Sequence, residues 1–401
     1  MSEFTVCAVV CEYDPFHNGH LYQLARAREI THARYMVCIM SGCITQRGSF
    51  SRYDRHLRAL SALRHGADLV LELPVRFSCA SAPEFAGGAV SIARRLGHCT
   101  HLSFGCEPDL IPQLDRIAAL LRQEPDMFAA TLRSLHKTGL SYPAAYARAM
   151  ATCLQEPGLD EKLSAPNAIL ALQYLRALPE EIRPVPVVRI GQYHDRTVSA
   201  FSSAGALREA ARDGRLNAEN AALSMPDPDL SLAAEAKREI HPPDALSESL
   251  LYLIRTASPQ ELRAVCGMDE GLENRFLELA RQVRSREELL AAVKTRRYTY
   301  AHLSRVCTCI LLRLTRQQAA ALPEPEYARI LGFRRHVAPL LRAIAETEGA
   351  IPLISRARDL PRDSVQFRLD HRAQVLWSLG CACPERQLGN PDLTVPPVIL
   401  D

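Results

Sequence analysis

The stretch Glu12-Tyr13-Asp14-Pro15-Phe16-His17-Asn18-Gly19-His20 joins an apolar run, Phe4 to Val10, to a segment with helical spacing that begins at Leu21. An apolar run, a short turn and a helix in this order are typical of the first unit of an α/β sheet. Pro15 fixes one φ angle, and Gly19 permits close approach of the backbone to a ligand. The stretch therefore predicts a strand, a turn and a helix with a binding site in the turn.

The start of the predicted helix is suited to a phosphate. Backbone N–H groups at a helix N-terminus are unpaired and attract anions. His17 and His20 are close enough in sequence to lie near the same helix start. Their imidazoles could donate hydrogen bonds to phosphoryl oxygens or stabilise charge that develops on them. The alternative is that the two histidines only cap and pack the turn.

Apolar runs alternate with helical patterns through the first half of the chain. The expected strands are Phe4–Val10, Tyr35–Met40, Leu69–Leu73, His101–Phe104 and Val185–Arg189. The expected helices lie at 21–30, 55–65, 84–96, 111–123, 125–136 and 167–177. This alternation predicts an α/β fold, a Rossmann-like domain with a parallel sheet. Loops at the carboxyl ends of its strands should build the site.

The strand pattern almost vanishes after Pro226. Helical spacing is found instead at 273–282, 286–294, 300–315 and 337–346. A polar stretch with prolines, Asp213 to Asp229, is the expected junction. The sequence thus predicts two domains, a sheet domain over residues 1–215 and a mostly α-helical C-terminal domain over 216–401.

The composition is that of a globular protein. The chain has 401 residues, of which 47% are hydrophobic, which suffices for two domains with cores of their own. No apolar run approaches the roughly 20 residues that span a bilayer, and the N-terminus lacks a signal-peptide pattern. We therefore expect a cytoplasmic protein that does not contact a membrane.

Cysteine is frequent, with 13 residues, but no Cys-x-x-Cys pair occurs. We expect most of these cysteines to be reduced, buried, small apolar residues, and we expect no metal site. The alternative is an intracellular metal or redox role. Cys43 and Cys106 stand apart because both fall in candidate site loops.

Positive charge is concentrated late in the chain. The formal net charge of +3 over 401 residues is not that of an obligatory nucleic-acid-binding protein. No acidic residue occurs from Leu289 to Pro323, however, and Tyr298 and Tyr300 lie within the basic run. Such a run is more often a solvated helix face than a surface for RNA phosphates. The residues that would contact RNA in the second case are Lys294, Arg296, Arg297 and Arg305.

Several motifs together resemble those of one known family. The segment from Asp14 to His20 resembles the HxGH motif of the nucleotidyltransferases, in which an acceptor attacks the α-phosphate of a nucleoside triphosphate. Further blocks, in the same order and spacing, are similar to those of the bacterial tRNA(Met) cytidine acetate ligases. They are Ser41-Gly42, Gln46-Arg47-Gly48, 68–74, 104–107, 139–143, 166–170, Arg189-Ile190-Gly191, Tyr193-His194-Asp195 and 297–300. The resemblance covers nearly the whole chain and raises the weight of the RNA-binding interpretation.

The resemblance implies a set of ATP-binding residues, of which His17 and His20 would be catalytic. The amide of Asn167 would contact adenine or ribose, and the guanidinium of Arg189 would contact phosphate or acetyl-adenylate. Ser203 and Arg208 would hold the leaving pyrophosphate. The full set is Val10, Cys11, Glu12, Tyr13, Asp14, Pro15, Phe16, His17, Asn18, Gly19, His20, Gly105, Asn167, Arg189, Ile190, Ser203 and Arg208.

The activity that the resemblance implies is an ATP-dependent acetate ligase. Acetate and ATP, carrying Mg²⁺, would give acetyl-adenylate, and the acetyl group would pass to N4 of the wobble cytidine of elongator tRNA(Met). Two residues depart from the family pattern: Cys43 stands where Asn is common, and Gly205 replaces the usual Thr of the Ser-rich loop. Two alternatives stay open, another HxGH nucleotidyltransferase or acetate ligase of the citrate lyase type, and a homologue that binds nucleotide or RNA without catalysis.

Overall fold

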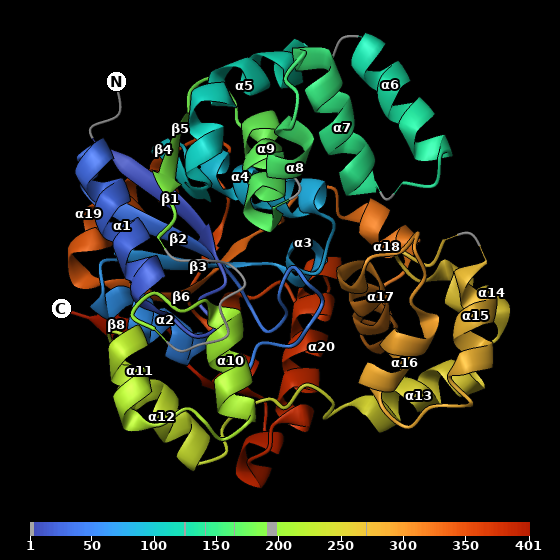
Figure 1. The fold of residues 1–401 in the computed structure, drawn as a ribbon. Helices are drawn as coiled ribbons and strands as arrows, with labels where there is room; N and C mark the ends of the chain where they lie inside the picture. Colours follow the sequence, from blue (N-terminus) through green and yellow to red (C-terminus); the bar gives the residue numbers. More distant parts are fainter. Residues whose placement is uncertain (1–3, 124–125, 141, 164, 191–198, 270) are drawn as a thin grey trace.

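The computed structural model describes residues 4–123, 126–140, 142–163, 165–190, 199–269 and 271–401, and a sheet of eight strands lies at their centre (Figure 1). The strands are β1 (Val6–Cys11), β2 (Tyr35–Ser41), β3 (Leu69–Leu73), β4 (Cys99–Cys106), β5 (Arg183–Val188), β6 (Ala328–Arg334), β7 (Leu353–Ile354) and β8 (Val398–Leu400). Their order across the sheet is β5-β4-β1-β2-β3-β6-β7, with β8 paired to β6. Neighbours among β1 to β5 are parallel, whereas β6 runs antiparallel to β3.

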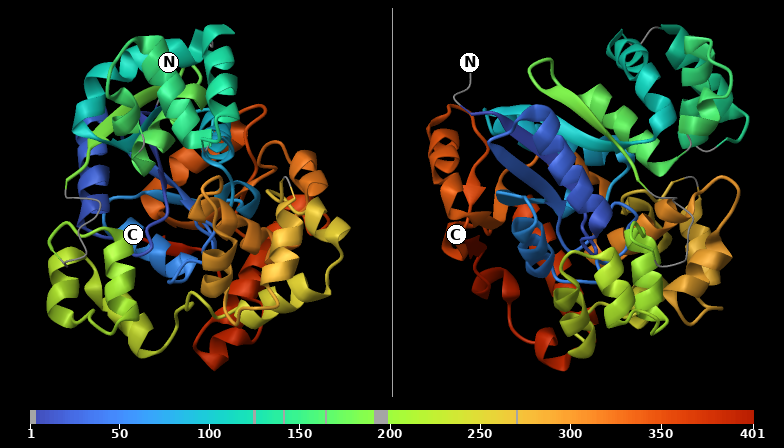
Figure 2. Two further views of the ribbon diagram at one scale, coloured as in Figure 1. Left: turned by 45° about the vertical axis from the view of Figure 1, so that its right-hand side comes forward. Right: turned by 60° about the vertical axis from the view of Figure 1, so that its left-hand side comes forward.

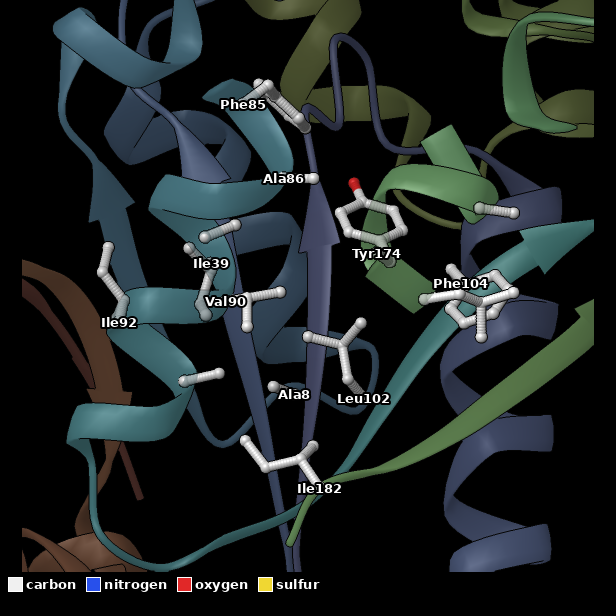
Figure 3. Packing of buried hydrophobic residues seen from close by; sticks show 14 of the residues in the cluster. Ala8, Ile39, Phe85, Ala86, Val90, Ile92, Leu102, Phe104, Tyr174 and Ile182 are labelled. Carbon is white, nitrogen blue, oxygen red and sulfur yellow. The ribbon is translucent and has the colours of Figure 1, made fainter. Parts of the chain in front are cut away.

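Helices cover both faces of the sheet, because its central strands are apolar on both sides. Alternate residues such as Ala8, Ile39 and Leu102 pack against α4 (Ala82–Arg95) and α9 (Pro166–Ala177), as Figure 3 shows. The opposite face, with residues such as Val9 and Met36, packs against α1 (Asn18–Thr31) and α2 (Arg55–Arg64). The result is a layered α/β core.

The remaining helices surround this core. In the first part of the chain they are α3 (Val75–Ser78), η1 (Pro108–Gln113), α5 (Leu114–Gln123), α6 (Asp126–Lys137), α7 (Tyr142–Leu154), α8 (Leu159–Leu163), α10 (Ala204–Arg212), α11 (Ala218–Ser224) and α12 (Pro228–Ala236). Later in the chain they are α13 (Ser247–Thr256), α14 (Pro259–Ala264), α15 (Leu272–Leu279), α16 (Arg286–Val293), α17 (Tyr300–Leu312), α18 (Arg316–Ala321), η2 (Arg335–Val337), α19 (Ala338–Glu346), η3 (Ala357–Asp359), α20 (Val365–Gly380), η4 (Pro384–Gln387) and α21 (Pro391–Thr394). None of the helices in the described ranges is long and apolar enough to cross a membrane.

The α/β class and the parallel sheet are confirmed, and all five strands expected from the sequence are present. The later segments are mainly helical, and helices α13 to α17 share an apolar core with α20. The expected loss of strands after Pro226 is wrong, however. Strands β6, β7 and β8 join the same sheet, and the orange and red segments that carry them lie beside the blue strands of the chain's beginning (Figures 1 and 2). The division into domains of 1–215 and 216–401 stays a prediction.

The missed strands have a physical reason. β7 and β8 are too short to show a period, and β6 carries arginines and a glycine within its seven residues. The polar stretch from Asp213 to Asp229 is also not a plain linker, since α11 begins within it. A capping box between Asn217 and Asn220 starts that helix.

A buried ionic cluster attaches the end of the chain to the sheet. Arg55 of α2 contacts Glu72 of β3 at 2.8 Å and Asp392 of α21 at 2.5 Å. Asp392 also accepts from Arg329 of β6 at 2.6 Å and faces the ring of His371 at 3.0 Å. Burial raises the pKa of Asp392, but Arg55, His371 and Arg329 together lower it well below its ordinary value. Asp392 is therefore held as a carboxylate between cations.

We expect Asp392→Asn to lower the free energy of unfolding by about 3 kcal/mol, because Arg55 and Arg329 lose their shared counter-charge in a buried place. Asp401→Asn is the matched control, since Asp401 pairs with Arg335 at 2.8 Å on the surface and both side chains are exposed. The control should change stability by less than about 1 kcal/mol. Urea unfolding measures both values, and equal effects would contradict the role given to the cluster.

Candidate active site

A cleft of about 530 Å³ opens at the carboxyl ends of the central strands. The chain passes from β1 to β2 and β3 on one side and later adds β4 and β5 on the other, so the strand order reverses between β1 and β4. Ligands of open α/β sheets bind at such a point. The walls come from the turn between β1 and α1, the loop at 45–49, β4, α9, the end of β5, and the start of α10.

His17 and His20 form the start of α1. His17 is the N-cap, and its Nδ1 accepts a hydrogen bond from the backbone N–H of Gly19 at 3.0 Å. The backbone N–H of His17 in turn donates to Nδ1 of His20 at 3.3 Å. The two rings stack with their centroids 3.7 Å apart. Because each Nδ1 is an acceptor, each ring in its neutral form carries its proton on Nε2.

Gly19 is needed by the turn itself. A Cβ atom at this position would lie 2.8 Å from Cε1 of His17, so the capping ring would have to shift. The sequence predicted that Gly19 lets a ligand approach the backbone closely. In the structure, its missing side chain leaves room for the capping ring of His17. The two interpretations of the histidines are therefore compatible, because the pair caps the helix and also lines the cleft.

Both imidazoles are neutral in the ligand-free protein. Burial, followed by the positive charges of Arg189 and Arg208, lowers the pKa of His17 to about 3. The pKa of His20 is lowered well below its ordinary value by burial and by His17, Arg189 and Arg208. A lowered histidine pKa means that the uncharged form is present at neutral pH. The pair can thus offer two Nε2–H donors, while the positive charge in the cleft comes from the arginines.

Arg189 and Arg208 approach the histidines from different elements. Arg189 follows β5, its backbone N–H donates to the carbonyl of Cys106, and its guanidinium lies 3.8 Å from Glu107. Arg208 lies on α10 and donates to the backbone carbonyl of Asp14. Ser203 caps α10, where its Oγ accepts from the N–H of Ala206 at 3.2 Å, so its own O–H stays able to donate to a ligand.

A buried arginine, which the sequence did not predict as a site residue, binds the ends of two strands beside the cleft. Arg58 of α2 is fully buried and donates from Nη1 to the carbonyls of Glu12 at 2.6 Å and Ser41 at 3.0 Å. Its Nη2 donates to the carbonyl of Gly42, and its Nε donates to that of Tyr53 at 3.1 Å. One guanidinium thereby holds the ends of β1 and β2 and the turn before α2.

Two carboxylates beside Arg58 hold loops in place. Asp14 accepts from the backbone N–H groups of Arg52 at 2.9 Å and Tyr53 at 3.1 Å. Glu12 accepts from the backbone N–H of Gln46 at 2.7 Å, which fixes the loop at 45–49 against the β1 end. Both residues line the cleft, but these oxygens serve the protein's own backbone.

The comparisons with known proteins agree along the whole chain. The family model described as HIGH Nucleotidyl Transferase matches residues 4–390. The tRNA(Met) cytidine acetate ligase of Syntrophomonas wolfei is 33% identical over 413 residues, which cover 98% of this chain and 99% of that protein. The ligase of the same name from Thermotoga maritima is 32% identical over 419 residues, with 97% and 99% covered. The chain belongs to the tRNA(Met) cytidine acetate ligase family.

A solved structure of this family has the same fold. The crystal structure of Thermotoga maritima TmcAL bound with alpha-thio ATP matches with a TM-score of 0.89 at 30% identity, and the match covers 99% of each chain. The nucleotidyltransferase class expected from the motif is thus confirmed. As a member of this family the chain is an enzyme of the ligase class.

The structure brings most of the predicted ATP-binding residues to the one cleft. Those that line it are Val10, Cys11, Glu12, Tyr13, Asp14, His17, Gly19, His20, Gly105, Asn167, Arg189, Ile190, Ser203 and Arg208. Pro15, Phe16 and Asn18 do not line it. Phe16 is buried between the rings of Tyr13 and His65. Asn18 donates to the carbonyls of Ala200 and Leu223 and so ties the turn to the segment around α10.

The structure also places in the cleft some residues that the sequence did not predict as site residues. Gln46 and Arg47 line the cleft, and both stood in a motif block but received no role. Tyr174 lies one helical turn beyond Leu170 on α9, a relation that helix spacing from Asn167 could have revealed. A Cβ at Gly105 would meet Cγ of Arg189 at an ordinary 3.5 Å, so the fold itself does not demand glycine there. The motif residues in 191–198 lie outside the described residues.

The four basic residues predicted for RNA differ in their surroundings. Arg296 and Arg297 are exposed before α17, and Arg297 lines a second cavity beside the cleft. Lys294 donates to the carbonyl of Thr295. Arg305 is largely covered and donates to the carbonyl of Gln46 at 3.1 Å, so it joins α17 to the 45–49 loop. This hydrogen bond gives Arg305 a structural role that is independent of RNA binding.

The cysteines are all free thiols. Cys43 is buried, donates to Oε1 of Gln374 at 2.9 Å, and has a raised pKa, mainly because of burial. Burial, with Glu107 as a smaller cause, raises the pKa of Cys106 to about 11. Neither thiol is a thiolate at neutral pH. The described part of the chain holds no group of three or more His, Cys, Asp or Glu side chains arranged for a metal ion.

We expect His17 and His20 to stay uncharged as the pH falls from 8 to 5, because the pKa of His17 is lowered to about 3 and that of His20 is lowered well below its ordinary value. NMR of protein labelled at the histidine rings measures the protonation of each ring as the pH changes. Spectra of the His17→Asn and His20→Asn variants assign the signals to the two residues. A ring that titrates near pH 6.5, the ordinary value for histidine, would contradict the arrangement.

We expect Arg58→Met to lower the free energy of unfolding by about 4 kcal/mol, since several buried carbonyls lose their donor at once. Arg64→Met, in the same helix, removes a partly exposed partner of Asp227 and should cost less than about 1 kcal/mol. Chemical denaturation compares the two variants. A small effect of Arg58→Met would show that the strand ends are held by other contacts.

Proposed function

We propose that this chain activates acetate with ATP and transfers the acetyl group to N4 of the wobble cytidine of elongator tRNA(Met), making N4-acetylcytidine. The observation that carries the proposal is the cleft itself, in which two neutral histidines, two arginines and the start of α1 meet at the strand ends. The family supports the choice of substrates, since relatives with matching length are named tRNA(Met) cytidine acetate ligase.

The first step joins acetate to the α-phosphate of ATP. A carboxylate oxygen attacks the α-phosphorus, the new O–P bond forms as the bond to the β-phosphate oxygen breaks, and pyrophosphate leaves. The Nε2–H groups of His17 and His20 would donate to phosphoryl oxygens as charge develops on them. Arg189 and Arg208 would offset the repulsion between the carboxylate and the triphosphate. No side-chain nucleophile is required, because acetate is itself the nucleophile.

Two features of the cleft support a role for the start of α10. Ser203 can donate its hydroxyl hydrogen, and Arg208 adds a positive charge on the next turn of the helix. Together they would hold the leaving pyrophosphate. Gly205, which stands in place of the usual Thr, lines the cleft without a hydroxyl, and its backbone N–H remains at the helix start.

The metal ion of this step would enter as part of the substrate. ATP is used by enzymes with Mg²⁺ bound to its phosphates, and the ion neutralises charge on the departing pyrophosphate. Most ligands of such an ion are phosphate oxygens and water. Glu12 and Asp14, two acidic residues of the cleft, already accept hydrogen bonds from backbone N–H groups, which fits an ion held mainly by the substrate.

The second step uses the acetyl-adenylate as an acyl donor. N4 of cytidine attacks the acetyl carbonyl carbon, the C–O bond to AMP breaks, and N4 loses one proton. Activation is needed because free acetate is a poor acyl donor. The exposed Arg296 and Arg297, with the half-buried Lys294 beside them, would bind RNA phosphates and position the acceptor without reading its bases.

We expect the protein to catalyse ATP–pyrophosphate exchange that depends on acetate, and His20→Asn to slow this exchange by about 100-fold, because it removes a transition-state donor. With elongator tRNA(Met), labelled acetate should appear in N4-acetylcytidine when nucleosides are analysed by mass spectrometry. Asn220→Ala in α11, at a residue that does not line the cleft, is the control variant and should exchange normally.

The other outcomes select among the alternatives. Exchange that depends on citrate or a mononucleotide instead of acetate would indicate another HxGH enzyme. Acetate-dependent exchange without N4-acetylcytidine would indicate a different acceptor. ATP binding without any exchange would overturn the proposed activity and favour a non-catalytic binder.

A further inference from the structure

The ATP cleft meets a second cavity, of about 1080 Å³, along the loop at 45–49 that follows β2. The walls of this cavity include α7, α9 and the segment that leads into α17. Four residues line both spaces: Gln46, Arg47, Ser49 and Leu170. Arg47 alone among these four carries a charge, so the place where the two spaces meet is positively charged.

Arg47 is exposed, whereas the residue before it is firmly held. The backbone N–H of Gln46 donates to Glu12, just after β1, and the carbonyl of Gln46 accepts from Arg305 of α17. The side-chain amide of Gln46 also donates to the carbonyl of Ala80 at 3.1 Å. Three separate parts of the chain therefore fix the residue that leads into Arg47.

The residue after Arg47 is held as closely. The carbonyl of Gly48 accepts from Oγ1 of Thr308 at 2.6 Å and from Nη2 of Arg286 at 2.8 Å. Gly48 has a φ of +74°, and a Cβ atom there would lie 2.4 Å from the backbone nitrogen of Arg305. A side chain at this position would collide with α17. Arg47 thus extends from a rigid loop, and a ligand that binds it does not have to order the backbone first.

Among the residues that the structure describes, three arginines line the ATP cleft, and they fall into two groups. Arg189 and Arg208 act on the histidine pair, since both lower the pKa of His17 and His20. Arg47 follows β2, whereas Arg189 follows β5, and these two strands lie on opposite sides of β1. Arg47 also reaches the second cavity, which the other two arginines do not line. The cleft therefore carries a separate positive charge at its border with the second cavity.

The proposed reaction sets two conditions on where acetate binds. The attacking and leaving oxygens of phosphoryl transfer are roughly in line, so acetate lies across the α-phosphate from the pyrophosphate. Ser203 and Arg208, which are proposed to hold the pyrophosphate, do not line the border of the two spaces. The acetyl group must also be reached by the RNA, and Arg297, a proposed RNA contact, lines the second cavity. A small carboxylate at the border meets both conditions.

We propose that Arg47 binds the carboxylate of acetate. This inference rests on the proposed function and specifies its acyl-substrate site. A planar guanidinium can donate two parallel N–H bonds to a carboxylate. One of the two carboxylate oxygens attacks the α-phosphorus and becomes the bridging oxygen of the adenylate as the bond to pyrophosphate breaks. Arg47 keeps its hydrogen bond to the other oxygen, which polarises the acetyl carbonyl when N4 of cytidine attacks and AMP leaves.

The dependence of ATP–pyrophosphate exchange on the acetate concentration tests the proposal. We expect Arg47→Met to raise the KM for acetate at least about tenfold, the effect of losing hydrogen bonds to a charged group. The Kd for ATP, measured by calorimetry without acetate, should change by less than about threefold, since Arg189 and Arg208 remain at the histidines. Arg47→Lys keeps the charge but not the planar fork and should give an intermediate KM. This variant decides if exchange by Arg47→Met is too slow to measure.

Arg342→Met is the matched control, since Arg342 is exposed on α19 and lines neither space. It should keep the wild-type KM for acetate. An equal rise in the Kd for ATP would assign Arg47 to the phosphates and overturn the proposal. An unchanged KM for acetate, with or without weaker binding of elongator tRNA(Met), would also overturn it. Absence of acetate-dependent exchange in the wild type would instead overturn the proposed function.

Discussion

The hydrogen bonds of the Arg58 guanidinium are the constraint on which the site depends. The backbone carbonyls of Glu12, Ser41 and Gly42 lie at the carboxyl ends of β1 and β2. All three accept hydrogen bonds from the one buried guanidinium. The carboxylates of Glu12 and Asp14 bind backbone N–H groups of neighbouring loops in the opposite sense. The cleft walls are therefore fixed before any nucleotide binds, and preorganisation of this kind lowers the cost of transition-state stabilisation.

Hydrogen bonds to the backbone also determine how the paired histidines are oriented. Each ring accepts a backbone hydrogen bond at Nδ1, which orients its Nε2–H. Burial and the charges of Arg189 and Arg208 keep both rings neutral, so the arginines supply the positive charge. Donors and cations are thus separate groups on separate elements. Helix α9 adds a further division, because one of its faces meets the nucleotide cleft and another meets the second cavity.

The sequence predicted the parts of this architecture that are local. The HxGH turn and the five parallel strands follow from the local motif and from periodicity. The choice of Gly105, Asn167, Arg189 and Arg208 as cleft residues followed from the resemblance to the family, and the structure places all four at the cleft. It did not predict contacts that depend on tertiary packing. Arg58 reads as an ordinary surface residue of a helix, β8 is too short for a pattern, and the covered position of Arg305 depends on a loop 259 residues away.

In the proposed reaction an activated acyl group forms in the cleft and passes directly to the acceptor. A single-turnover chase tests it most directly: the protein is loaded with labelled acetate and ATP, freed of both by rapid gel filtration, and mixed with elongator tRNA(Met). We expect the label to move to N4 of cytidine without added ATP, and AMP to appear in equal amount. Release of the label as free acetate, or a renewed requirement for ATP, would contradict it.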